Sequence, residues 1–220
     1  NSLIVSTSNN RNKRLPIGCD VPETIILADG DFPSHPLALE WLRQCPYVVC
    51  CDGAANTYIR SGRMPEAIVG DGDSLLPDIK ERYASLIHSE AEQETNDLSK
   101  AFRFCLSQER KRITIMGATG KREDHTIGNV SLLADYMEQA EVSMMTDYGI
   151  FVPIREDSMF ESYIGQQISV FNMNSTALSA EGLAYPLSVF TNWWQGTLNE
   201  ALARHFIIRT EGKVLVFRVF

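Results

Sequence analysis

The sequence has no apolar run that approaches the roughly 20 residues required by a membrane-spanning helix. Its first residues, 1–6, lack the charged-then-apolar form of a signal peptide. Basic residues are in the minority, since 20 Lys and Arg stand against 28 Asp and Glu and give a net charge of -8. An acidic chain is a poor partner for a nucleic-acid backbone, although a local site for a small phosphate can still be basic. We therefore expect neither a membrane nor a nucleic acid as partner.

Paired cysteines are also missing. The five cysteines form neither a Cys-x-x-Cys pair nor a disulfide framework, and most lie in apolar stretches: Cys19, Cys45, Cys50, Cys51 and Cys105. This usage is typical of reduced thiols in the core of a protein from a reducing compartment. The sequence therefore predicts a cytoplasmic protein.

Apolar runs alternate with helical stretches from residue 24 onward. Strands are expected at residues 25–28, 47–51, 67–69, 112–116 and 142–145, and helices at residues 36–45, 53–61, 77–86, 97–109 and 123–139. Strands that alternate with helices indicate βαβ units and a parallel sheet. The first half is therefore predicted to be an α/β domain, preceded by a polar appendage at residues 1–23.

After about Asp147, short β-type runs replace the helices. These runs cover residues 167–171, 206–209 and 214–220 and are separated by glycines. The segment 210–213 is typical of a hairpin turn, which predicts that the last two strands pair with each other. We expect an α/β domain at residues 24–147 and a smaller antiparallel β domain at residues 155–220.

Acidic residues follow the ends of several apolar runs. Asp52 follows the run 47–51, and Asp97 opens a helix. Asp71 and Asp73 follow the run 67–69, each beside a glycine. If the runs are neighbouring strands, these carboxylates meet at the sheet edge where parallel sheets bind ligands. Carboxylates about 4 Å apart repel by about 4 kcal/mol at an effective dielectric constant of about 20, so the cluster needs protons or a cation. The hypothesis that fits is Mg²⁺, which takes one or two carboxylates and completes its shell with water and phosphate.

Simpler interpretations exist for some of these acids. Asp52 alone could cap the helix that follows it. Asp97 and Lys100 lie three residues apart, hence on one side of a helix. They form either a weak surface ion pair or a site in which Lys100 neutralises phosphate. The residues alone leave these alternatives open.

A glycine-rich loop at residues 117–125 follows a predicted strand and precedes a predicted helix. At such a position, backbone N–H groups and the helix dipole hold anions, and Arg122 can bind a phosphate with two hydrogen bonds. The loop is neither a Walker loop nor a Gly-x-Gly-x-x-Gly loop. His125 lies beside Asp124 in this loop and is either structural or part of the site.

Together, four segments resemble the thiamine pyrophosphokinase family: residues 52–56, 70–74, 93–101, and 117–125 with Asn129. Their order and spacing match the family from about residue 24 onward. The resemblance implies a Rossmann-like nucleotide-binding domain followed by a β-sandwich thiamine-binding domain, assembled as a homodimer with active sites between subunits. It also implies transfer of pyrophosphate from ATP to thiamine, with Mg²⁺ as cofactor and AMP as the second product.

The resemblance also assigns roles to residues. Asp71, Asp73 and Asp97 would form the metal-binding and catalytic group, with Asp73 or Asp97 accepting the proton of the thiamine hydroxyl. Gln93 would contact the substrate near its reacting end, and Tyr185 and Asn199 would bind thiamine. The nucleotide-binding set would be Asp52, Asn56, Ser74, Lys100, Thr119, Arg122, Asp124, His125 and Asn129.

Some positions differ from the family pattern. Glu92 and Glu94 replace aspartates on either side of Gln93. Tyr185 stands where the family carries a thiamine-stacking tryptophan, and Leu198 replaces a serine. The aromatic faces that suit a cationic ligand would then come from Tyr185 or from the neighbouring residues Trp193 and Trp194.

Two other functions use the same features. A metal-dependent phosphohydrolase also needs clustered aspartates, but it has no alcohol acceptor. A thiamine or nucleotide sensor keeps the pocket and binds without turnover.

Overall fold

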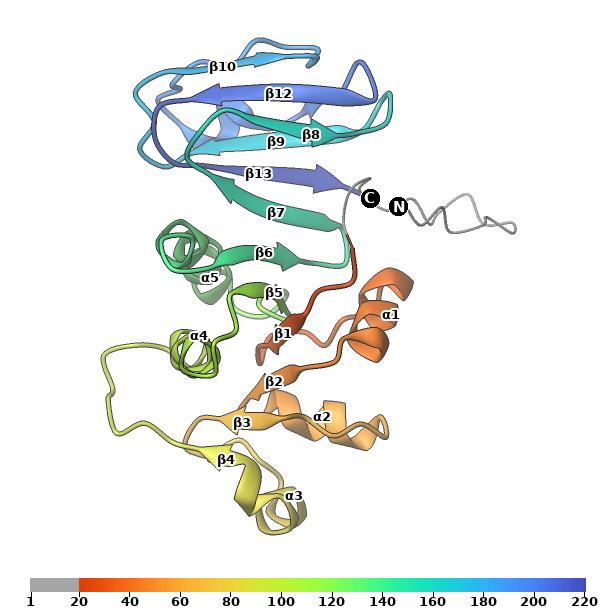
Figure 1. The fold of residues 1–220 in the computed structure, drawn as a ribbon, viewed down its shortest axis with the longest axis vertical. Coiled ribbons are helices and arrows are strands. Elements are labelled where there is room, and N and C mark those ends of the chain that lie inside the picture. Colours follow the sequence, from red (N-terminus) through yellow and green to blue (C-terminus); the bar gives the residue numbers. More distant parts are fainter. Residues whose placement is uncertain (1–19) are drawn as a thin grey trace.

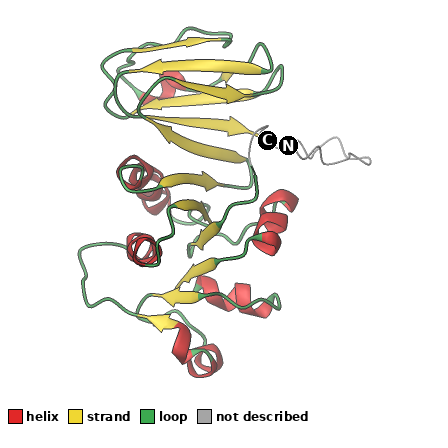
Figure 2. Ribbon diagram, in the orientation of Figure 1, coloured by secondary structure: helices red, strands yellow, loops and turns green. Residues whose placement is uncertain are grey.

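The computed structural model of the chain describes residues 20–220, so Cys19 and most of the predicted appendage lie outside the described residues. The described part contains a ten-stranded sheet and a three-stranded sheet (Figure 1). Helices accompany the first half of the chain, whereas the second half is built almost entirely of strands (Figure 2). None of the helices in residues 20–220 has both the length and the apolarity needed to cross a bilayer.

Six parallel strands form the first part of the large sheet, in the spatial order β6-β5-β1-β2-β3-β4. Their bounds are β1 Thr24–Leu27, β2 Val48–Cys51, β3 Ala67–Val69, β4 Ile87–His88, β5 Arg112–Met116 and β6 Glu141–Met145. Strands β1, β2 and β3 are buried along their whole length. Burial on both faces explains why the sequence shows these strands as continuous apolar runs instead of alternating patterns.

Helices cover both faces of this part of the sheet. The bounds are α1 Pro36–Gln44, α2 Ala54–Arg60, α3 Pro77–Arg82, α4 Asp97–Ser107 and α5 Glu123–Tyr136, with a 3-10 turn at Ala84–Leu86. Helices α4 and α5 pack on one face, and α1, α2 and α3 pack on the other (Figure 1). The predicted strands and helices of the first half are therefore confirmed, with ends that differ by a few residues.

The order of the parallel strands creates a switch point beside β1. From β1 the chain adds β2, β3 and β4 on one side, and then returns to add β5 and β6 on the other. In sheets of this kind, ligands bind in the crevice beyond the carboxyl ends of the strands at the switch point. The loops after β1 and β5 are therefore the first places to look for a site.

The second half continues the same sheet. Strand β7, Gly149–Ile154, pairs antiparallel with β6, and the sheet then continues through β13, Val214–Val219, and β9, Gln167–Asn172, to β11, Asn199–Glu200. The three-stranded sheet consists of β8, Ser158–Glu161, β12, His205–Thr210, and β10, Leu178–Glu181. It packs against the far part of the large sheet around a separate apolar core, in which Phe160 and Phe206 stack. The fold is α/β followed by a β-sandwich, as predicted, but one sheet runs through both halves. The boundaries given for the domains stay a prediction.

The predicted pairing of the last two strands is wrong. Strand β12 pairs with β10 and β8, while β13 pairs with β7 and β9, so the two strands lie in different sheets. Ile208 of β12 and Val214 and Val216 of β13 belong to the same buried core. The two strands therefore face each other across the sandwich. The turn at Gly212 crosses from one sheet to the other instead of closing a hairpin.

The described cysteines are free thiols, as the sequence predicts. Cys50, Cys51 and Cys105 are buried and Cys45 is partly buried. Burial raises the pKa of Cys105 to about 12, so this thiol stays protonated and unreactive at neutral pH.

Candidate active site

Aspartates follow three adjacent parallel strands at their carboxyl ends. Asp29 follows β1, Asp52 follows β2 and Asp71 follows β3. A fourth, Asp97, is the first residue of α4, whose buried face packs against β2 and β3. The four carboxyl groups are close enough to affect one another's pKa values. The predicted meeting of carboxylates at one sheet edge is therefore observed for Asp52, Asp71 and Asp97, with Asp29 as an additional member.

Glycines make the close approach of these acids possible. A Cβ atom on Gly70 would lie 2.9 Å from the Cβ of Asp52, and Gly70 has a φ of +145°. A Cβ atom on Gly53 would lie 2.7 Å from Oδ2 of Asp29. Since larger residues would push the loops apart, both glycines are required by the geometry of the cluster.

Asp52 is the buried member of the cluster. Only 4% of its surface is exposed. Its carboxyl group bonds the Asp71 side chain and accepts the backbone N–H of Ser74, while its Oδ1 atom has no hydrogen-bond partner within the described part of the chain. It does not cap α2, because the N-cap residue of that helix is Gly53. The cap interpretation of Asp52 is therefore wrong.

Burial and mutual repulsion shift the pKa values of the cluster. Desolvation, together with the hydrogen bond to Asp71, raises the pKa of Asp52 to about 6. The backbone N–H of Asp73 and the Asp52 side chain lower the pKa of Asp71. Burial raises the pKa of Asp97, and the charge of Lys100 opposes this shift. Asp52 and Asp71 thus share a hydrogen bond in which Asp52 holds the proton more strongly.

This pair makes stability depend on pH. The pKa of Asp52 is raised from 3.8 to about 6 in the folded state, so the folded protein binds more protons than the unfolded chain between about pH 4 and pH 6. The contribution of Asp52 to stability is full below that window and is lost as the pH rises through it. We expect Asp52→Asn to remove this fall and to be more stable than the parent protein above pH 6 by about 1–3 kcal/mol. Urea unfolding at pH 4 and pH 7 in the presence of EDTA measures the difference in free energy of unfolding between Asp52→Asn and the parent protein. If this difference were the same at both pH values, the raised pKa of Asp52 would be contradicted.

Lys100 places a positive charge beside the acids. Only 7% of Lys100 is exposed, and its Nζ atom lies 4.0 Å from Oδ1 of Asp97. Its charge also lowers the pKa of Asp71. Because Lys100 is buried and its charge acts on both Asp97 and Asp71, the interpretation as a weak surface ion pair does not hold. It balances part of the charge of the cluster.

The acids offer a partial cation site. Residues 20–220 contain no group of three or more Asp, Glu, His or Cys side chains arranged to hold a metal ion. Asp73 uses its backbone N–H to bind Asp71, at 2.9 Å. The unpartnered Oδ1 of Asp52 and the adjacent exposed carboxylate of Asp71 leave oxygen atoms for a hard cation. Such a site would need water or phosphate oxygens to complete its shell, which is how Mg²⁺ is usually bound.

The loops after β1 and β5 join at the switch point. The backbone N–H of Gly30 donates to the carbonyl of Gly117 at 2.6 Å, and that of Asp31 donates to Thr119 at 2.9 Å. Lys121 donates to the carbonyl of Asp29 at 3.0 Å. The sequence prediction missed Asp29 and Asp31. The signal was the same acid-glycine-acid pattern after an apolar run that identified Asp71 and Asp73.

Exposed charges lie at the start of α5. Arg122 binds Asp124 through two hydrogen bonds of 3.1 and 2.6 Å. Asp124 also accepts the backbone N–H of His125. Arg122 must therefore release Asp124 before both its donors can bind a phosphate.

Two predicted nucleotide-binding asparagines shape the loops. The Asn56 amide donates to the carbonyl of Ser74 and accepts the backbone N–H of Leu76. The Asn129 amide donates to the carbonyl of Ala118 and accepts from Asn96. These amides hold the loops after β3 and β5, so any contact with a ligand would have to share them.

The predicted thiamine-binding residues lie in the sandwich half. The Asn199 side chain is buried and bonds both the N–H and the carbonyl of Tyr185, at 3.1 and 2.9 Å. The Tyr185 residue is 63% exposed and Leu198 is 85% exposed. Asn199 thus fixes the backbone that presents the tyrosine. In the large sheet, six strands separate β11, which carries Asn199, from β2, which precedes Asp52. The seven spacings between β11 and β2, at about 4.8 Å each, put the two parts of the predicted site roughly 34 Å apart within one chain.

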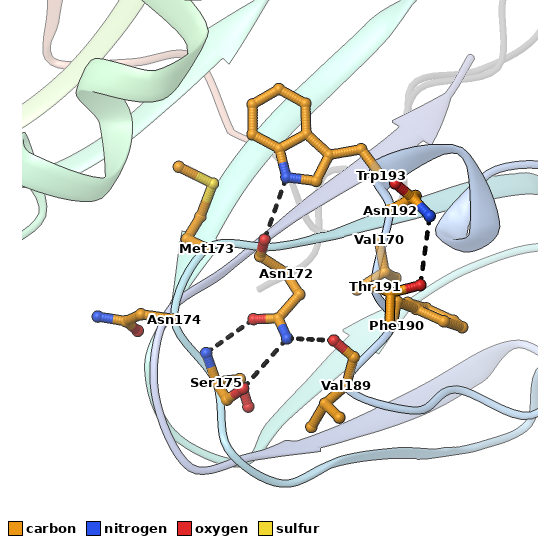
Figure 3. Close-up of a pocket in the computed structure, with 10 residues that line it drawn as sticks. All are labelled: Val170, Asn172, Met173, Asn174, Ser175, Val189, Phe190, Thr191, Asn192 and Trp193. Atoms are coloured by element: carbon orange, nitrogen blue, oxygen red, sulfur yellow. Dashed lines mark hydrogen bonds between the residues drawn. The ribbon is translucent and has the colours of Figure 1, made fainter.

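A separate pocket of about 420 Å³ lies at the end of β9 (Figure 3). Asn172 organises it: the amide donates to the carbonyls of Ser175 and Val189, and the backbone carbonyl accepts the indole N–H of Trp193 at 3.2 Å. Because its polar groups already bind one another, the pocket offers a ligand few free hydrogen-bonding atoms. The close-up shows Trp193 held by this network.

Comparison with known proteins gives two family matches. Residues 38–145 match the thiamin pyrophosphokinase catalytic domain, and residues 149–217 match the thiamin pyrophosphokinase substrate-binding domain. The chain is 30% identical over 129 residues to thiamine pyrophosphokinase 1 of Oryza sativa subsp. japonica, which covers 47% of this chain and 49% of that protein. It is 34% identical over 86 residues to thiamine pyrophosphokinase of Bacillus subtilis (strain 168), covering 37% of this chain and 40% of that one. The chain thus spans about half the length of the curated relatives that it matches.

Solved structures share the fold. The crystal structure of thiamine pyrophosphokinase from Bacillus subtilis superposes with a TM-score of 0.74 at 20% identity, covering 89% of this chain and 98% of that chain. The crystal structure of yeast thiamin pyrophosphokinase gives a TM-score of 0.74 at 17% identity, covering 96% and 92%. The parallel sheet and the sandwich therefore occur together in both.

Proposed function

Because the chain belongs to the thiamin pyrophosphokinase family, we propose that it transfers a pyrophosphoryl group from ATP to the hydroxyl of thiamine, giving thiamine diphosphate and AMP. The observation that supports this most is the set of carboxyl groups at the ends of β1, β2 and β3 with the buried cation of Lys100 beside it. A triphosphate with a divalent ion is the ligand that matches such a mixture of charges.

The nucleotide would lie across the switch point. Its phosphates would face the loop after β5, where backbone N–H groups at the start of α5 and the side chains of Lys121 and Arg122 can neutralise them. Mg²⁺, when bound, would neutralise charge on the phosphates. Asp52 and Asp71 fit as its protein ligands, with Asp97 completing the acidic wall, because Asp52 has an unpartnered oxygen and Asp71 is exposed beside it. Asp73 stands next to this pair as a further ligand of the proposed set.

In this reaction the protein mainly aligns the two substrates and balances the negative charge of the phosphates. The thiamine hydroxyl would attack the β-phosphorus of ATP in line with the bond to AMP, which leaves with its oxygen as that bond breaks. A carboxylate must take the hydroxyl proton. Asp97 suits this role, because burial raises its pKa and makes it a stronger base than an ordinary aspartate. Lys100 would stabilise negative charge on the transferred group.

We propose that the enzyme works as a homodimer in the cytoplasm, with thiamine bound by Tyr185 of one subunit at the acidic site of the other. The separation of roughly 34 Å within one chain supports this arrangement, since a single subunit keeps the two parts of the site apart. Exposed apolar side chains in the sandwich half also support it: Ile164, Tyr185, Trp194, Leu198 and Leu202. Free thiols at the described cysteines fit a reducing compartment.

Mixing two defective variants tests the shared site. Asp71→Asn and Tyr185→Ala each damage a different half of the proposed site. If sites form between subunits, exchange of subunits between the two variants creates some sites with neither change, and activity should recover to about a quarter of the parent value. A mixture whose activity stays at the average of the two variants would mean that each site is built within one chain.

The function itself is tested with ATP, Mg²⁺ and thiamine. Chromatography of the products should show AMP and thiamine diphosphate in equal amounts. Phosphate without a thiamine product would instead indicate a phosphohydrolase, and binding of thiamine or ATP without turnover would indicate a sensor.

A further inference from the structure

The loop between β4 and α4 has little apolar packing to hold it. Residues 89–96 are all exposed, and the loop stands away from the body of the molecule (Figure 1). This loop carries Gln93. The family resemblance implies that Gln93 contacts the substrate near its reacting end, and under the proposed function that substrate is thiamine. A loop without a core keeps one conformation only if hydrogen bonds or ion pairs fix it.

One carboxylate organises the end of the loop. Glu92 accepts the backbone N–H groups of Glu94 and Thr95 and the hydroxyl of Thr95, the last at 2.6 Å. Gln93 lies inside this turn. The conformation of its backbone is therefore set by the position of the Glu92 carboxylate.

A single guanidinium then ties this turn to α4. Nη2 of Arg103 donates to Glu90 at 2.5 Å, to Glu92 at 3.1 Å and to the hydroxyl of Thr95 at 3.0 Å. An exposed ion pair alone contributes only about 0.2–1 kcal/mol, but here three contacts converge on a segment that lacks other packing. We propose that Arg103 is a positioning residue for thiamine: it latches the loop 89–96 to α4 and so holds Gln93 in place at the proposed site.

The contacts of Arg103 with Glu90, Glu92 and Thr95, here called the latch, are separate from the acidic group. The start of α4 is fixed by Asn96, whose side chain accepts the N–H of Ser99 and donates to Asn129. Asp97 therefore keeps its place when Arg103 is removed. This separation predicts a selective effect on thiamine binding, with the ATP site and the chemical step preserved.

The inference rests on the proposed function and is tested with two independent readouts. Hydrogen exchange of the protein without substrates should show the amides of Glu94 and Thr95 exchanging at least about tenfold faster in Arg103→Ala. Steady-state kinetics should show KM for thiamine raised about 5–10-fold, with kcat and KM for ATP within about twofold of the parent values. Because one nitrogen makes all three contacts, the ammonium of Arg103→Lys should restore most of both properties.

Two further variants complete the test. Glu92→Gln should resemble Arg103→Ala, and the double variant should be little worse than either, since both changes open the same latch. Arg112→Ala is the matched control, because Arg112 pairs with Glu23 and Glu141 at the amino end of β5, away from the site. It should leave exchange of the loop and both KM values unchanged.

The outcomes separate the inference from the function. Unchanged exchange in Arg103→Ala overturns the latch, and a loss of kcat or of ATP affinity as large as the loss of thiamine affinity overturns its selective role. An Arg103→Lys variant as defective as Arg103→Ala also contradicts it. If the parent protein forms no thiamine diphosphate, the proposed function fails and the role in thiamine binding fails with it, whereas the exchange result still decides whether the latch exists.

Discussion

Replacement of Asp71 by asparagine should lower kcat at least about 100-fold and leave the fold intact. Asparagine has nearly the same shape and can still accept the N–H of Asp73 through its carbonyl oxygen, so the loop after β3 should keep its conformation. It cannot supply the negative charge that a divalent cation requires, nor the charged partner of the Asp52 carboxyl group. The rate of AMP formation at saturating ATP, thiamine and Mg²⁺ measures the loss, and the midpoint of thermal unfolding reports on the fold.

Asp135→Asn provides the control for this substitution. Asp135 is an exposed residue near the end of α5 and takes no part in the acidic cluster. The Asp135→Asn variant should retain nearly full activity. If Asp71→Asn also retained nearly normal activity, Asp71 would have no role in binding the cation, and the site would have to be rebuilt around other acids.

The α/β half was predictable because its local and tertiary signals agree. The strand Arg112–Met116 was predicted with the bounds that the structure has, since it is an apolar run between a polar turn and a glycine. Helix α4 has apolar residues at helical spacing, and four of these five residues are buried: Leu98, Ala101, Phe102 and Cys105, with Leu106 partly buried. In both cases the element is buried along a face that the sequence pattern itself reveals.

The sandwich half was less predictable, because short β-type runs do not specify their partners. Residues 206–209 and 214–220 were correctly expected to be extended, and the glycine between them suggested the common hairpin. The choice between a hairpin and a crossing between sheets depends on which side of each strand is buried against which core, a property of the assembled sandwich. The sequence around Gly212 is compatible with both.

The candidate site also has one part that the sequence predicts and one part that it does not. Acid and glycine patterns after apolar runs located Asp52 and Asp71 correctly at one edge, and the same pattern at Asp29 and Asp31 was available but not used. What the sequence could not reveal is how the side-chain amides are used. The side-chain amides of Asn56 and Asn199 form hydrogen bonds with neighbouring backbone groups. Only the structure shows whether such an amide holds a loop in place or remains free to bind a ligand.

Removal of the buried cation should have the other large effect. Lys100→Met keeps most of the side-chain volume and removes the charge beside Asp97 and Asp71. We expect kcat/KM for ATP to fall about 100–1000-fold, because charge on the transferred group would lose a preorganised positive partner. Steady-state kinetics with ATP varied at saturating thiamine measure this fall. Lys111→Met, an exposed lysine before β5, is the control and should be nearly unaffected.

The pH profile of the Lys100→Met variant distinguishes an electrostatic role from a packing role. Burial raises the pKa of Asp97 and Lys100 lowers it, so removal of Lys100 should raise the pKa of Asp97 further. If Asp97 must be ionised to accept the proton, the acidic limb of kcat/KM should move to higher pH in the variant. A methionine that only disturbed packing would lower activity without moving this limb. A variant with activity within a few-fold of the parent and an unmoved limb would remove Lys100 from the phosphate site and leave it as a structural counter-charge to Asp97.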